Sequence, residues 1–430
     1  MNVIEYPDKA IWSDITKRPQ IDLTKLSETV KNVLSDVKTR GDNAVKDYEL
    51  KFDHAAINNL RVSENEIEEA LMHTDDRLLD AIKLAHDNIA KFHKAQSFKG
   101  IEVETQPGVT CMQRSVPIGN VGLYIPGGTA PLFSTVLMLA TPARIAGCKR
   151  IVMCTPPDKD GNINRAVLAA ASVAGVHEIY KIGGVQAIGA MAYGTESIEK
   201  VDKIFGPGNQ FVMAAKQEVS LHDVAIDMPA GPSEVCVIAD ETARPDFIAA
   251  DMLSQAEHGT DSQAMLITTS KKILDEVKNE VLVQLESLPR KDFAAKSLLS
   301  SKLILVRNTD EAISLSNVYA PEHLIIATKD YEELSHKVTN AGSVFLGNYA
   351  CESAGDYASG TNHTLPTHGY AKAYSGVNVD SFCRKITFQQ ITPEGIMNIG
   401  QAVEIMAENE SLEAHKRAMT IRIEYIENNK

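Results

Sequence analysis

Residues 121–155, VGLYIPGGTAPLFSTVLMLATPARIAGCKRIVMCT, decide the fold class of this chain. They hold a short apolar run, VGLYI, then a glycine turn, a long apolar stretch over 131–146 and a second short apolar run, RIVMCT. Short apolar runs bounded by turn residues are typical of buried strands, and the longer stretch between them is typical of a helix. The order strand, helix, strand predicts a parallel βαβ unit with helices on both faces of the sheet.

The apolar character of this region does not indicate a membrane helix. Residues 115–143 carry no charge, and they exceed the roughly 20 residues that span a bilayer. Four prolines and four glycines lie among them, and these would leave backbone groups without hydrogen bonds in lipid. We therefore expect a buried strand, a turn and a buried helix of a globular protein.

The alternation of strands and helices continues in two series. In the first series, helices are expected at 164–174, 185–192 and 209–220, and strands at EIYKIG (178–183) and KIFG (203–206). In the second series, strands are expected at EVCVIA (234–239), AMLITT (264–269), KLILVR (302–307), LIIAT (324–328) and SVFLG (343–347), with helices at 244–257, 272–287, 310–318 and 330–339. The pattern predicts two successive Rossmann-like parallel-sheet units.

Helical patterns dominate both ends of the chain. Apolar residues recur three and four apart over much of 1–110, and two helices are expected at about 393–408 and 410–427, after polar, glycine-rich loops that begin at 348. We expect an α/β protein of four parts. These are an N-terminal helical segment packing on the α/β units (1–114), a first α/β unit (115–232), a second α/β unit (233–378) and a C-terminal helical tail (379–430).

The composition narrows the class of protein. A chain of 430 residues with 44% hydrophobic and 23% charged residues is close to the average for globular proteins and predicts two or three domains. Its net charge of −14 disfavours binding to nucleic acid or to an anionic membrane. Six cysteines without a CxxC pair, and an N-terminus without a basic and then apolar run, predict a cytoplasmic protein with free thiols.

The usual nucleotide-binding fingerprints are missing from the sequence. No GxGxxG follows an expected strand, and no GxxxxGK[ST] occurs. Glycine loops stand instead at the ends of expected strands, at 127–128 (GG), 183–184 (GG) and 206–209 (GPGN). Backbone N–H groups of such loops can approach a phosphate, and open α/β sheets bind ligands at the carboxyl ends of their strands. Ordinary tight turns use glycine as well, so a structural role stays open.

Two short clusters could bind a metal or move protons. Gln255 and His258 lie three residues apart and would share a helix face, which is the spacing of two ligands from one helix. A histidine at a helix end can equally interact with the helix dipole. Glu322 and His323 would face opposite sides in a regular strand, but Pro321 favours an irregular entry that lets both reach one cleft as acid and base. A capped strand start with a solvated glutamate is the alternative.

Two further pairs lie in the C-terminal quarter of the chain. Asp356 and His363 belong to GDYASGTNH, a polar and glycine-rich stretch that we expect to be a loop, and such loops often carry function. Glu410 and His415 belong to ENESLEAHK on the closing helix. The acidic residues there could equally form a solvated helix face.

Long motifs in a fixed order carry a resemblance to a known family. They are LYIPGGTAPLFSTVLMLATPARIAGC, IFGPGNQFV, IDMPAGPSEV, MLSQAEHG, PEHLI and SAGDYASGTNH, spread from residue 123 to residue 363. In this order they resemble the histidinol dehydrogenases, and the resemblance covers nearly the whole chain. It implies a zinc-dependent oxidoreductase of histidine biosynthesis that converts L-histidinol through L-histidinal to L-histidine with two NAD.

The resemblance also implies a role for each candidate residue. The catalytic pair would be Glu322, which activates a water for the second oxidation, and His323, the general base. The ligands of one zinc ion per subunit would be Gln255, His258, Asp356 and His415. The NAD contacts, in the first α/β unit, would be Tyr124, Gln186 and Asn209. The substrate contacts would be Ser233, Gln255, His258, His323, Asp356, His363, Glu410 and His415.

The resemblance further implies a homodimer with shared active sites. The second α/β unit would carry the zinc and catalytic residues, and the C-terminal tail would form the dimer, so that Glu410 and His415 enter from the partner. Two other functions stay open. A zinc hydrolase could use the same ligands with Glu322 as base and would reduce no NAD. A related zinc and NAD dehydrogenase of another amino alcohol would lack contacts to an imidazole ring.

Overall fold

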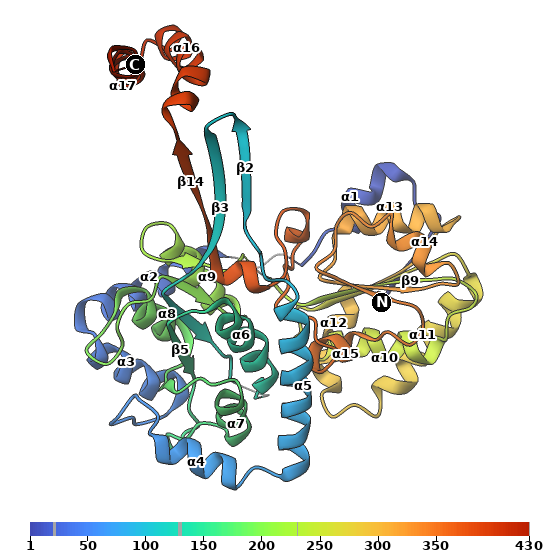
Figure 1. Cartoon of the computed structure of the whole chain (residues 1–430). Coiled ribbons are helices and arrows are strands. Elements are labelled where there is room, and N and C mark those ends of the chain that lie inside the picture. The colour runs from blue at the N-terminus through green and yellow to red at the C-terminus, as the bar shows by residue number, and fades with distance from the viewer. Residues whose placement is uncertain (20–22, 128–130, 230, 430) are drawn as a thin grey trace. The chain divides into compact units, whose positions relative to one another are not determined.

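The structure of the protein, a computed structural model, describes residues 1–19, 23–127, 131–229 and 231–429. The chain forms two compact units (Figure 1). The first comprises Met1–Ala95 and Gly119–Phe382, and the second comprises Gln96–Ile118 and Cys383–Lys430. Gly128, in one of the glycine loops of the sequence, lies outside the described residues. None of the described helices is both long enough and apolar enough to cross a membrane.

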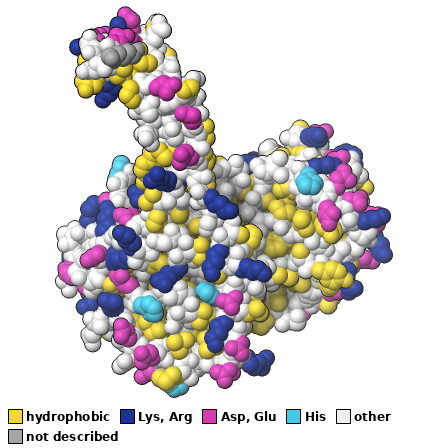
Figure 2. Space-filling model, in the orientation of Figure 1, with side chains coloured by type: hydrophobic (Ala, Val, Ile, Leu, Met, Phe, Trp, Pro, Cys, Tyr) yellow, Lys and Arg dark blue, Asp and Glu magenta, His cyan; other side chains and the backbone are white. Residues whose placement is uncertain are grey.

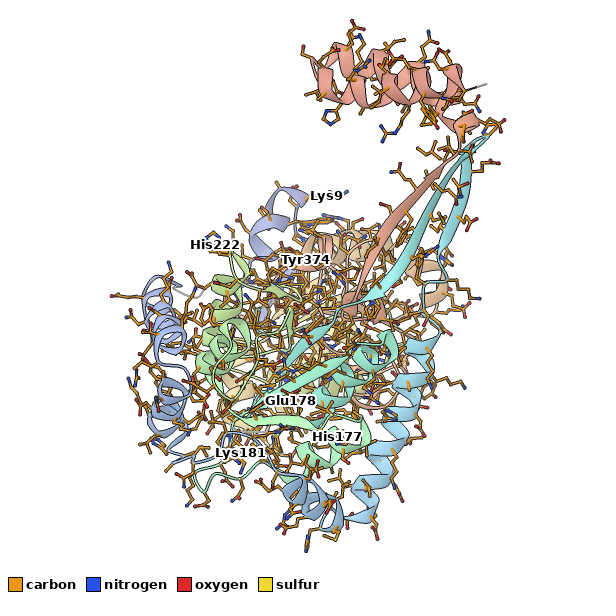
Figure 3. All side chains as sticks on the ribbon, turned by 60° about the vertical axis from the view of Figure 1, so that its left-hand side comes forward. Lys9, His177, Glu178, Lys181, His222 and Tyr374 are labelled. Carbon is orange, nitrogen blue, oxygen red and sulfur yellow. The ribbon has the colours of Figure 1, made fainter. Side chains whose placement is uncertain are left out.

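The first sheet of the first unit has parallel strands in the order β6-β5-β4-β7-β8. Its strands are β4 (Asn120–Tyr124), β5 (Arg150–Thr155), β6 (Glu178–Lys181), β7 (Lys203–Phe205) and β8 (Ala225–Ile226). Figure 3 labels Glu178 and Lys181, the first and last residues of the edge strand β6. The predicted glycine loops follow the carboxyl ends of β4, β6 and β7.

The second sheet of the first unit is also parallel, with the order β1-β11-β10-β9-β12-β13. Its strands are β1 (Asn2–Glu5), β9 (Glu234–Ala239), β10 (Gln263–Thr268), β11 (Lys302–Leu305), β12 (His323–Ala327) and β13 (Ser343–Leu346). Val235 and Val237 of β9 point into one core cluster, and Cys236 and Ile238 point into another. A strand buried on both faces reads as an unbroken apolar run, which is why EVCVIA shows no alternation.

Helices cover both faces of the two sheets (Figure 1). The helices associated with the first sheet are α2 (Leu23–Arg40), α3 (Asp42–Tyr48), a π-helical turn (Glu49–Asp53), α4 (Glu64–Met72), α5 (Asp76–Lys94), α6 (Phe133–Ala146), α7 (Arg165–Val173), α8 (Gly184–Tyr193) and α9 (Gln210–Ser220). The helices associated with the second sheet are α1 (Trp12–Ile15), α10 (Pro245–Ala256), α11 (Lys271–Leu285), α12 (Lys291–Ser300), α13 (Thr309–Tyr319), α14 (Tyr331–Ser335) and α15 (Glu352–Tyr357). The 3-10 turns are Lys9–Ile11, Tyr370–Lys372 and Val379–Phe382.

Burial accounts for the absence of charged residues from positions 133–143 of helix α6. Its residues 134–143 are all buried, because α5 and α7 pack against it and it also contacts β4. Helices α2, α8 and α9 pack together elsewhere on the first sheet, where Leu34 and Val37 of α2 lie against Gly189 of α8. A side-chain carbon at Gly189 would lie 3.2 Å from Val37, so the two helices could not approach as closely.

The second unit is built from an antiparallel sheet and two helices. The sheet has the order β14-β3-β2, and its strands are β2 (Ile101–Gln106), β3 (Val109–Pro117) and β14 (Cys383–Ile391). Helices α16 (Pro393–Asn409) and α17 (Glu413–Asn428) pack on each other. Many of its large hydrophobic side chains are exposed, and Figure 2 shows such side chains on its surface. They include Ile101, Val103, Ile386, Phe388, Ile391, Met397, Ile405, Met406, Leu412, Ile421 and Tyr425.

The predicted fold class is confirmed, since both parallel sheets and the terminal helices are present. The expectation of mainly helical structure over 1–110 is wrong at its two ends, where β1, β2 and the start of β3 lie. The tail likewise contains β14 before its helices. These strands are mostly solvent-exposed, so their pairing determines their conformation. Strands β1 and β14 pair with the distant strands β11 and β3, and β2 pairs with the adjacent β3. The four sequence domains stay a prediction.

Candidate active site

The Glu322–His323 pair stands where helix α13 turns into strand β12. Ala320 ends α13 in the left-handed region, with φ of 54°, and Pro321 follows directly. Strand β12 then begins at His323, between β9 and β13. The irregular entry predicted from the proline is present, and both side chains of the pair are buried.

Glu322 is held by groups from two other elements. Its Oε2 accepts the backbone N–H of Glu234 at 2.9 Å and the side-chain N–H of Gln255 at 3.3 Å. Only 6% of Glu322 is exposed. Burial raises the pKa of Glu322 to about 8, against the opposing effect of the neighbouring His323. The carboxyl group therefore titrates near neutral pH, as an acid–base group requires.

His323 is held at both ring nitrogens. Its Nδ1 lies 3.2 Å from the backbone oxygen of Glu234, and its Nε2 lies 3.2 Å from Oδ1 of Asp356. Since a carbonyl oxygen only accepts, Nδ1 carries a proton and Nε2 is the nitrogen that exchanges one. Burial would lower the pKa of His323, but the charges of Glu352 and Glu322 and the bond to Asp356 raise it to about 10.

Beside this pair lies a donor set that fits a divalent metal ion. Nitrogen or oxygen atoms of His258, Glu352 and Asp356 all lie within 4.8 Å of one another. Gln255, at the end of α10, contributes a buried Oε1 that has no hydrogen-bond partner among the described residues. An unpaired buried oxygen is costly unless a ligand satisfies it. Nitrogen and oxygen donors of this kind suit zinc.

The electrostatics of the donor set depend on its burial. Burial raises the pKa of Glu352 well above its usual value. Burial also acts to raise the pKa of Asp356, but the hydrogen bond and charge of His323 keep it below its usual value. A bound cation would favour the ionised form of both carboxyl groups.

His363 closes the site on the side of helix α6. Its Nδ1 lies 2.9 Å from the backbone oxygen of Asp356, and its Nε2 lies 3.1 Å from Oγ1 of Thr135 on α6. Burial lowers the pKa of His363, which favours the neutral ring. Asp356 itself lies in helix α15, so the expectation that it belongs to a loop is wrong. Ser233 is half-buried and directly precedes β9 and Glu234.

The three predicted cofactor contacts stand at the glycine turns of the first sheet. Tyr124 ends β4, and its hydroxyl oxygen accepts the backbone N–H of Gly184 at 3.1 Å. Gln186, fully buried in α8, donates from Nε2 to Glu49 at 2.7 Å. Asn209 caps helix α9, because its side-chain oxygen accepts two backbone N–H groups at 3.0 and 3.1 Å. If Asn209 contacts a cofactor, its amide nitrogen would make the contact, because the side-chain oxygen is used in the helix cap.

Glu410 and His415 belong to the second unit. Glu410 is the residue at which α16 ends, and His415 lies in the first turn of α17. Both are exposed to solvent. Their predicted roles stay a prediction.

Several residues that shape these sites were not predicted from the sequence. Glu352 lies four residues before Asp356, a spacing that would have placed both on one face had a helix been predicted there. Glu234 of β9 contacts the Glu322–His323 pair, Arg18 of the N-terminal segment contacts Glu234, and no local pattern marks either residue. Glu49 and Asp53 reach the Gly183 turn from the π-helical segment, which reads as ordinary helix in the sequence.

Comparison with known proteins gives a consistent result. The family model for histidinol dehydrogenase matches residues 16–423. A histidinol dehydrogenase of Bacteroides fragilis is 63% identical over 426 residues, which cover 99% of this chain and all of that protein. The chloroplastic histidinol dehydrogenase of Arabidopsis thaliana is 52% identical and matches 96% of this chain and 89% of its own. A crystal structure of histidinol dehydrogenase from Elizabethkingia anophelis superposes with a TM-score of 0.97 at 54% identity, with 99% of each chain covered.

Proposed function

The chain belongs to the histidinol dehydrogenase family, and on that premise we propose that it oxidises L-histidinol through L-histidinal to L-histidine, with two NAD and one zinc ion per subunit. The observation that carries the proposal is the buried Glu322–His323 pair beside the unpaired oxygen of Gln255. A proton-transfer pair and a metal donor set in one place support an alcohol oxidation better than binding alone.

The cofactors would supply what the side chains cannot. A zinc ion, when bound, would hold the substrate through its nitrogen atoms, and NAD, when bound, accepts hydride. The zinc would be held by Gln255, His258, Asp356 and His415, and Glu352 stands next to this set. NAD would lie against Tyr124, Gln186 and Asn209 at the carboxyl ends of the first sheet, where open α/β sheets bind their ligands.

His323 would take the hydroxyl proton of the substrate in the first oxidation. Its Nδ1 is committed to the Glu234 carbonyl, so Nε2 is the base. With the surrounding carboxylates uncompensated, the pKa of His323 is about 10 and the ring is cationic. Positive charge at the neighbouring donor set would lower that pKa and free Nε2 to accept a proton.

Glu322 would activate a water molecule for the second oxidation, which needs the aldehyde in its hydrated form. Its Oε2 already accepts two hydrogen bonds, from Glu234 and Gln255. These bonds fix the carboxyl group in place, and its other oxygen, Oε1, would be the one that accepts a proton from water. His323 would then accept the proton of the hydrate as the second hydride leaves.

The second unit would form a homodimer in which the active sites are shared. Its sheet and helices expose many large hydrophobic side chains, including Phe388 and Met406, which supports burial against a second copy of the chain. Glu410 and His415 would then enter the partner's site. The six cysteines are free thiols, which supports a location in the cytoplasm.

The stoichiometry of NADH formation tests the proposed reaction. Purified protein with zinc should form two NADH for each L-histidinol consumed, with L-histidine as the product. One NADH per histidinol, with histidinal accumulating, would contradict the four-electron reaction. Conversion of an amino alcohol without an imidazole ring at an equal rate would contradict the substrate.

Mixed dimers test the shared site. His323→Asn and His415→Asn, each inactive alone, would be unfolded and refolded together. If His415 enters from the partner, one site of each mixed dimer carries neither lesion, and about a quarter of all sites should recover with random pairing. No recovery, in a sample whose mixed dimers are shown by mass, would mean that each subunit builds its own site.

A further inference from the structure

We infer that Arg18 is a positioning residue for the catalytic pair, which it holds through Glu234. The inference rests on the proposed function, because it assigns a role in the chemistry of Glu322 and His323. Arg18 lies in the N-terminal segment between α1 and α2, more than two hundred residues before the strand that it supports. It does not contact the reacting atoms itself.

The backbone of Glu234 binds both members of the pair. Its N–H donates to Oε2 of Glu322 at 2.9 Å, and its carbonyl oxygen lies 3.2 Å from Nδ1 of His323. One residue at the start of β9 therefore sets the position of the carboxyl group and the orientation of the imidazole ring. A shift of Glu234 would move both groups together.

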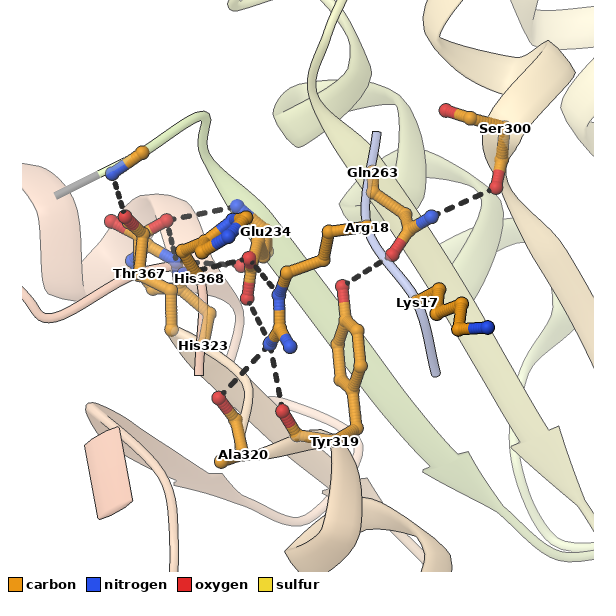
Figure 4. A network of polar contacts seen from close by, with 12 residues as sticks. Lys17, Arg18, Glu234, Gln263, Ser300, Tyr319, Ala320, His323, Thr367 and His368 are labelled. Carbon is orange, nitrogen blue, oxygen red and sulfur yellow. Dashed lines mark hydrogen bonds and ion pairs between the residues drawn. The ribbon is translucent and has the colours of Figure 1, made fainter. Parts of the chain in front are cut away.

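The side chain of Glu234 is fixed mainly by Arg18 (Figure 4). Nε of Arg18 donates to one carboxylate oxygen of Glu234, and Nη2 donates to the other at 2.7 Å. The backbone N–H of His368 adds a third bond, at 2.8 Å, to Oε1. The two bonds from Arg18 fix the direction of the Glu234 carboxylate as well as its distance, which a single point charge could not do.

Arg18 also holds the turn that leads into the pair. Its Nη2 donates to the backbone oxygens of Tyr319 at 2.7 Å and Ala320 at 3.2 Å, and the guanidinium carbon lies 4.1 Å from the centre of the Tyr319 ring. These are carbonyl groups at the end of α13, where a helix leaves its acceptors unsatisfied. Ala320 is the left-handed residue that precedes Pro321 and Glu322. The guanidinium thus joins the end of α13 to the start of β9, on either side of the pair.

The contacts are buried, so water cannot replace them. The side chains of Arg18 and Glu234 are 12% and 3% exposed. Burial alone would lower the pKa of Arg18, but the bond to Glu234 raises it. Without Arg18, the carboxylate of Glu234 would keep the His368 N–H and lose its charge partner, and it would turn toward other donors. The backbone of Glu234 would move with it.

Arg18→Ala tests the inference, with Lys17→Ala as the matched control. Lys17 is the neighbouring residue, and its exposed side chain forms an ion pair with Asp14. In Arg18→Ala we expect kcat for both oxidations to fall roughly a hundredfold, because misplacement of catalytic groups by about 1 Å has an effect of that size. The KM for histidinol and the zinc content should stay within about threefold of the wild type, since the partners that the described residues offer Arg18 are Glu234 and the end of α13, not the metal donors. Lys17→Ala should behave as wild type.

Two further measurements separate positioning from mere stability. Millimolar guanidinium ion should restore part of the kcat of Arg18→Ala and should leave Lys17→Ala unchanged. Arg18→Lys keeps the charge but not the two-point contact, so its kcat should lie between those of Arg18→Ala and the wild type. If Arg18→Ala does not fold, Arg18→Lys and Glu234→Gln carry the same test. A variant that loses thermal stability while its folded molecules keep wild-type kcat would overturn the inference.

An NMR readout keeps this test apart from the proposed function. In protein labelled with 15N in the imidazole rings, the Nδ1–H signal of His323 should shift or broaden in Arg18→Ala and not in Lys17→Ala. An unchanged signal would overturn the inference whatever the enzyme's substrate. A changed signal in a protein that never oxidises histidinol would uphold the positioning role and refute the proposed reaction.

Discussion

The two sheets of the first unit present their candidate sites at opposite ends of their strands. In the first sheet, the predicted cofactor contacts follow the carboxyl ends of β4, β6 and β7 and are gathered at glycine turns. In the second sheet, Glu234 and His323 begin β9 and β12, so the candidate catalytic pair stands at the amino ends. The backbone of the glycine turns shapes the first site, whereas the second site consists of side chains that residues from distant segments hold in place. Glycines make the first kind of site visible in a sequence, but no local pattern reveals the residues that hold the second.

Removal of the metal should have the largest effect, and it concerns the second sheet alone. His258→Asn should lose zinc and all measurable oxidation of histidinol, because it removes one of the converging donors. His222→Asn is the matched control, since His222 is an exposed histidine in the loop after α9 (Figure 3). Elemental analysis and turnover would be measured on both. Full turnover in His258→Asn without metal would remove zinc from the mechanism.

The catalytic pair should divide its work between the two oxidations. His323→Asn should slow both steps by about 10²–10⁴, because it removes the general base. Glu322→Gln should slow oxidation of histidinal more than that of histidinol, since only the second step needs an activated water. Single-turnover rates on each substrate would measure this.

Variants of helix α14 serve as controls for the pair. Glu332→Gln and His336→Asn change the same residue types at exposed positions just after β12, and they should leave both rates unchanged. Equal losses on both substrates from Glu322→Gln would contradict the division of labour.

A glycine turn of the first sheet can be broken without touching the pair. Gly206 has φ of 127°, and a side-chain carbon there would lie 2.1 Å from the backbone oxygen of Tyr124. Gly206→Ala should move the turn and raise the KM for NAD about tenfold, which corresponds to roughly 1.4 kcal/mol. The affinity for histidinol, measured by calorimetry, should not change.

Gly175→Ala is the control for that turn. Gly175 also has a positive φ, of 74°, but its nearest side-chain neighbour would be Arg144 at 3.4 Å, so only the conformational strain is matched. A rise of the NAD KM in both variants would show that strain alone, not the Gly206 turn, governs cofactor binding.

The smallest effect concerns Glu49, the buried carboxyl group that contacts the Gly183 turn. Burial raises the pKa of Glu49 to about 8, despite the bond from Gln186. In the unfolded chain this group ionises near its ordinary value, so the unfolded state binds fewer protons between about pH 4.5 and 8. The stability that Glu49 contributes is therefore complete at low pH and is lost as the pH rises toward 8. Glu49→Gln cannot ionise and should remove this decline.

Thermal unfolding of Glu49→Gln at pH 5 and pH 8 would measure that decline. The variant should gain stability relative to the wild type at pH 8 compared with pH 5. The glutamine oxygen can still accept the N–H of Gly183, which Glu49 now accepts at 2.9 Å. The exposed Glu241→Gln should show no such pH dependence. A constant difference between variant and wild type at both pH values would refute the raised pKa.

Much of the fold could be predicted because its strands are buried on both faces. Runs such as IVMC (151–154) and VCVIA (235–239) are apolar throughout, so they stand out from the helices between them. The second unit offered no such signal, since all six residues of β2 are exposed and only the pairing with β3 makes it a strand. Strand β1 was missed because its partner, β11, lies about 300 residues later in the chain.

Only those residues of the candidate site that belong to recognisable sequence motifs could be predicted. The resemblance named the pair and the metal donors, and Gln255, His258, Asp356 and His323 do lie together. Glu234 reads as the first residue of an apolar strand, and Arg18 as one basic residue among many. Their roles arise from contacts between segments far apart in sequence, and a single sequence does not display such contacts.

The pairing of strand β1 affects the order in which the two sheets can fold during synthesis. Asn2 pairs opposite Lys302, so strand β1 waits for about 300 further residues before its partner exists. At ribosomal rates of roughly 5–20 residues per second, that wait lasts about 15–60 s. The first sheet, whose strands lie between residues 120 and 226, can assemble during that interval, whereas the second sheet cannot complete its β1 edge. The sheet whose strands β9 and β12 begin with Glu234 and His323 therefore assembles later than the first sheet, and its β1 edge closes only after residue 302 has been made.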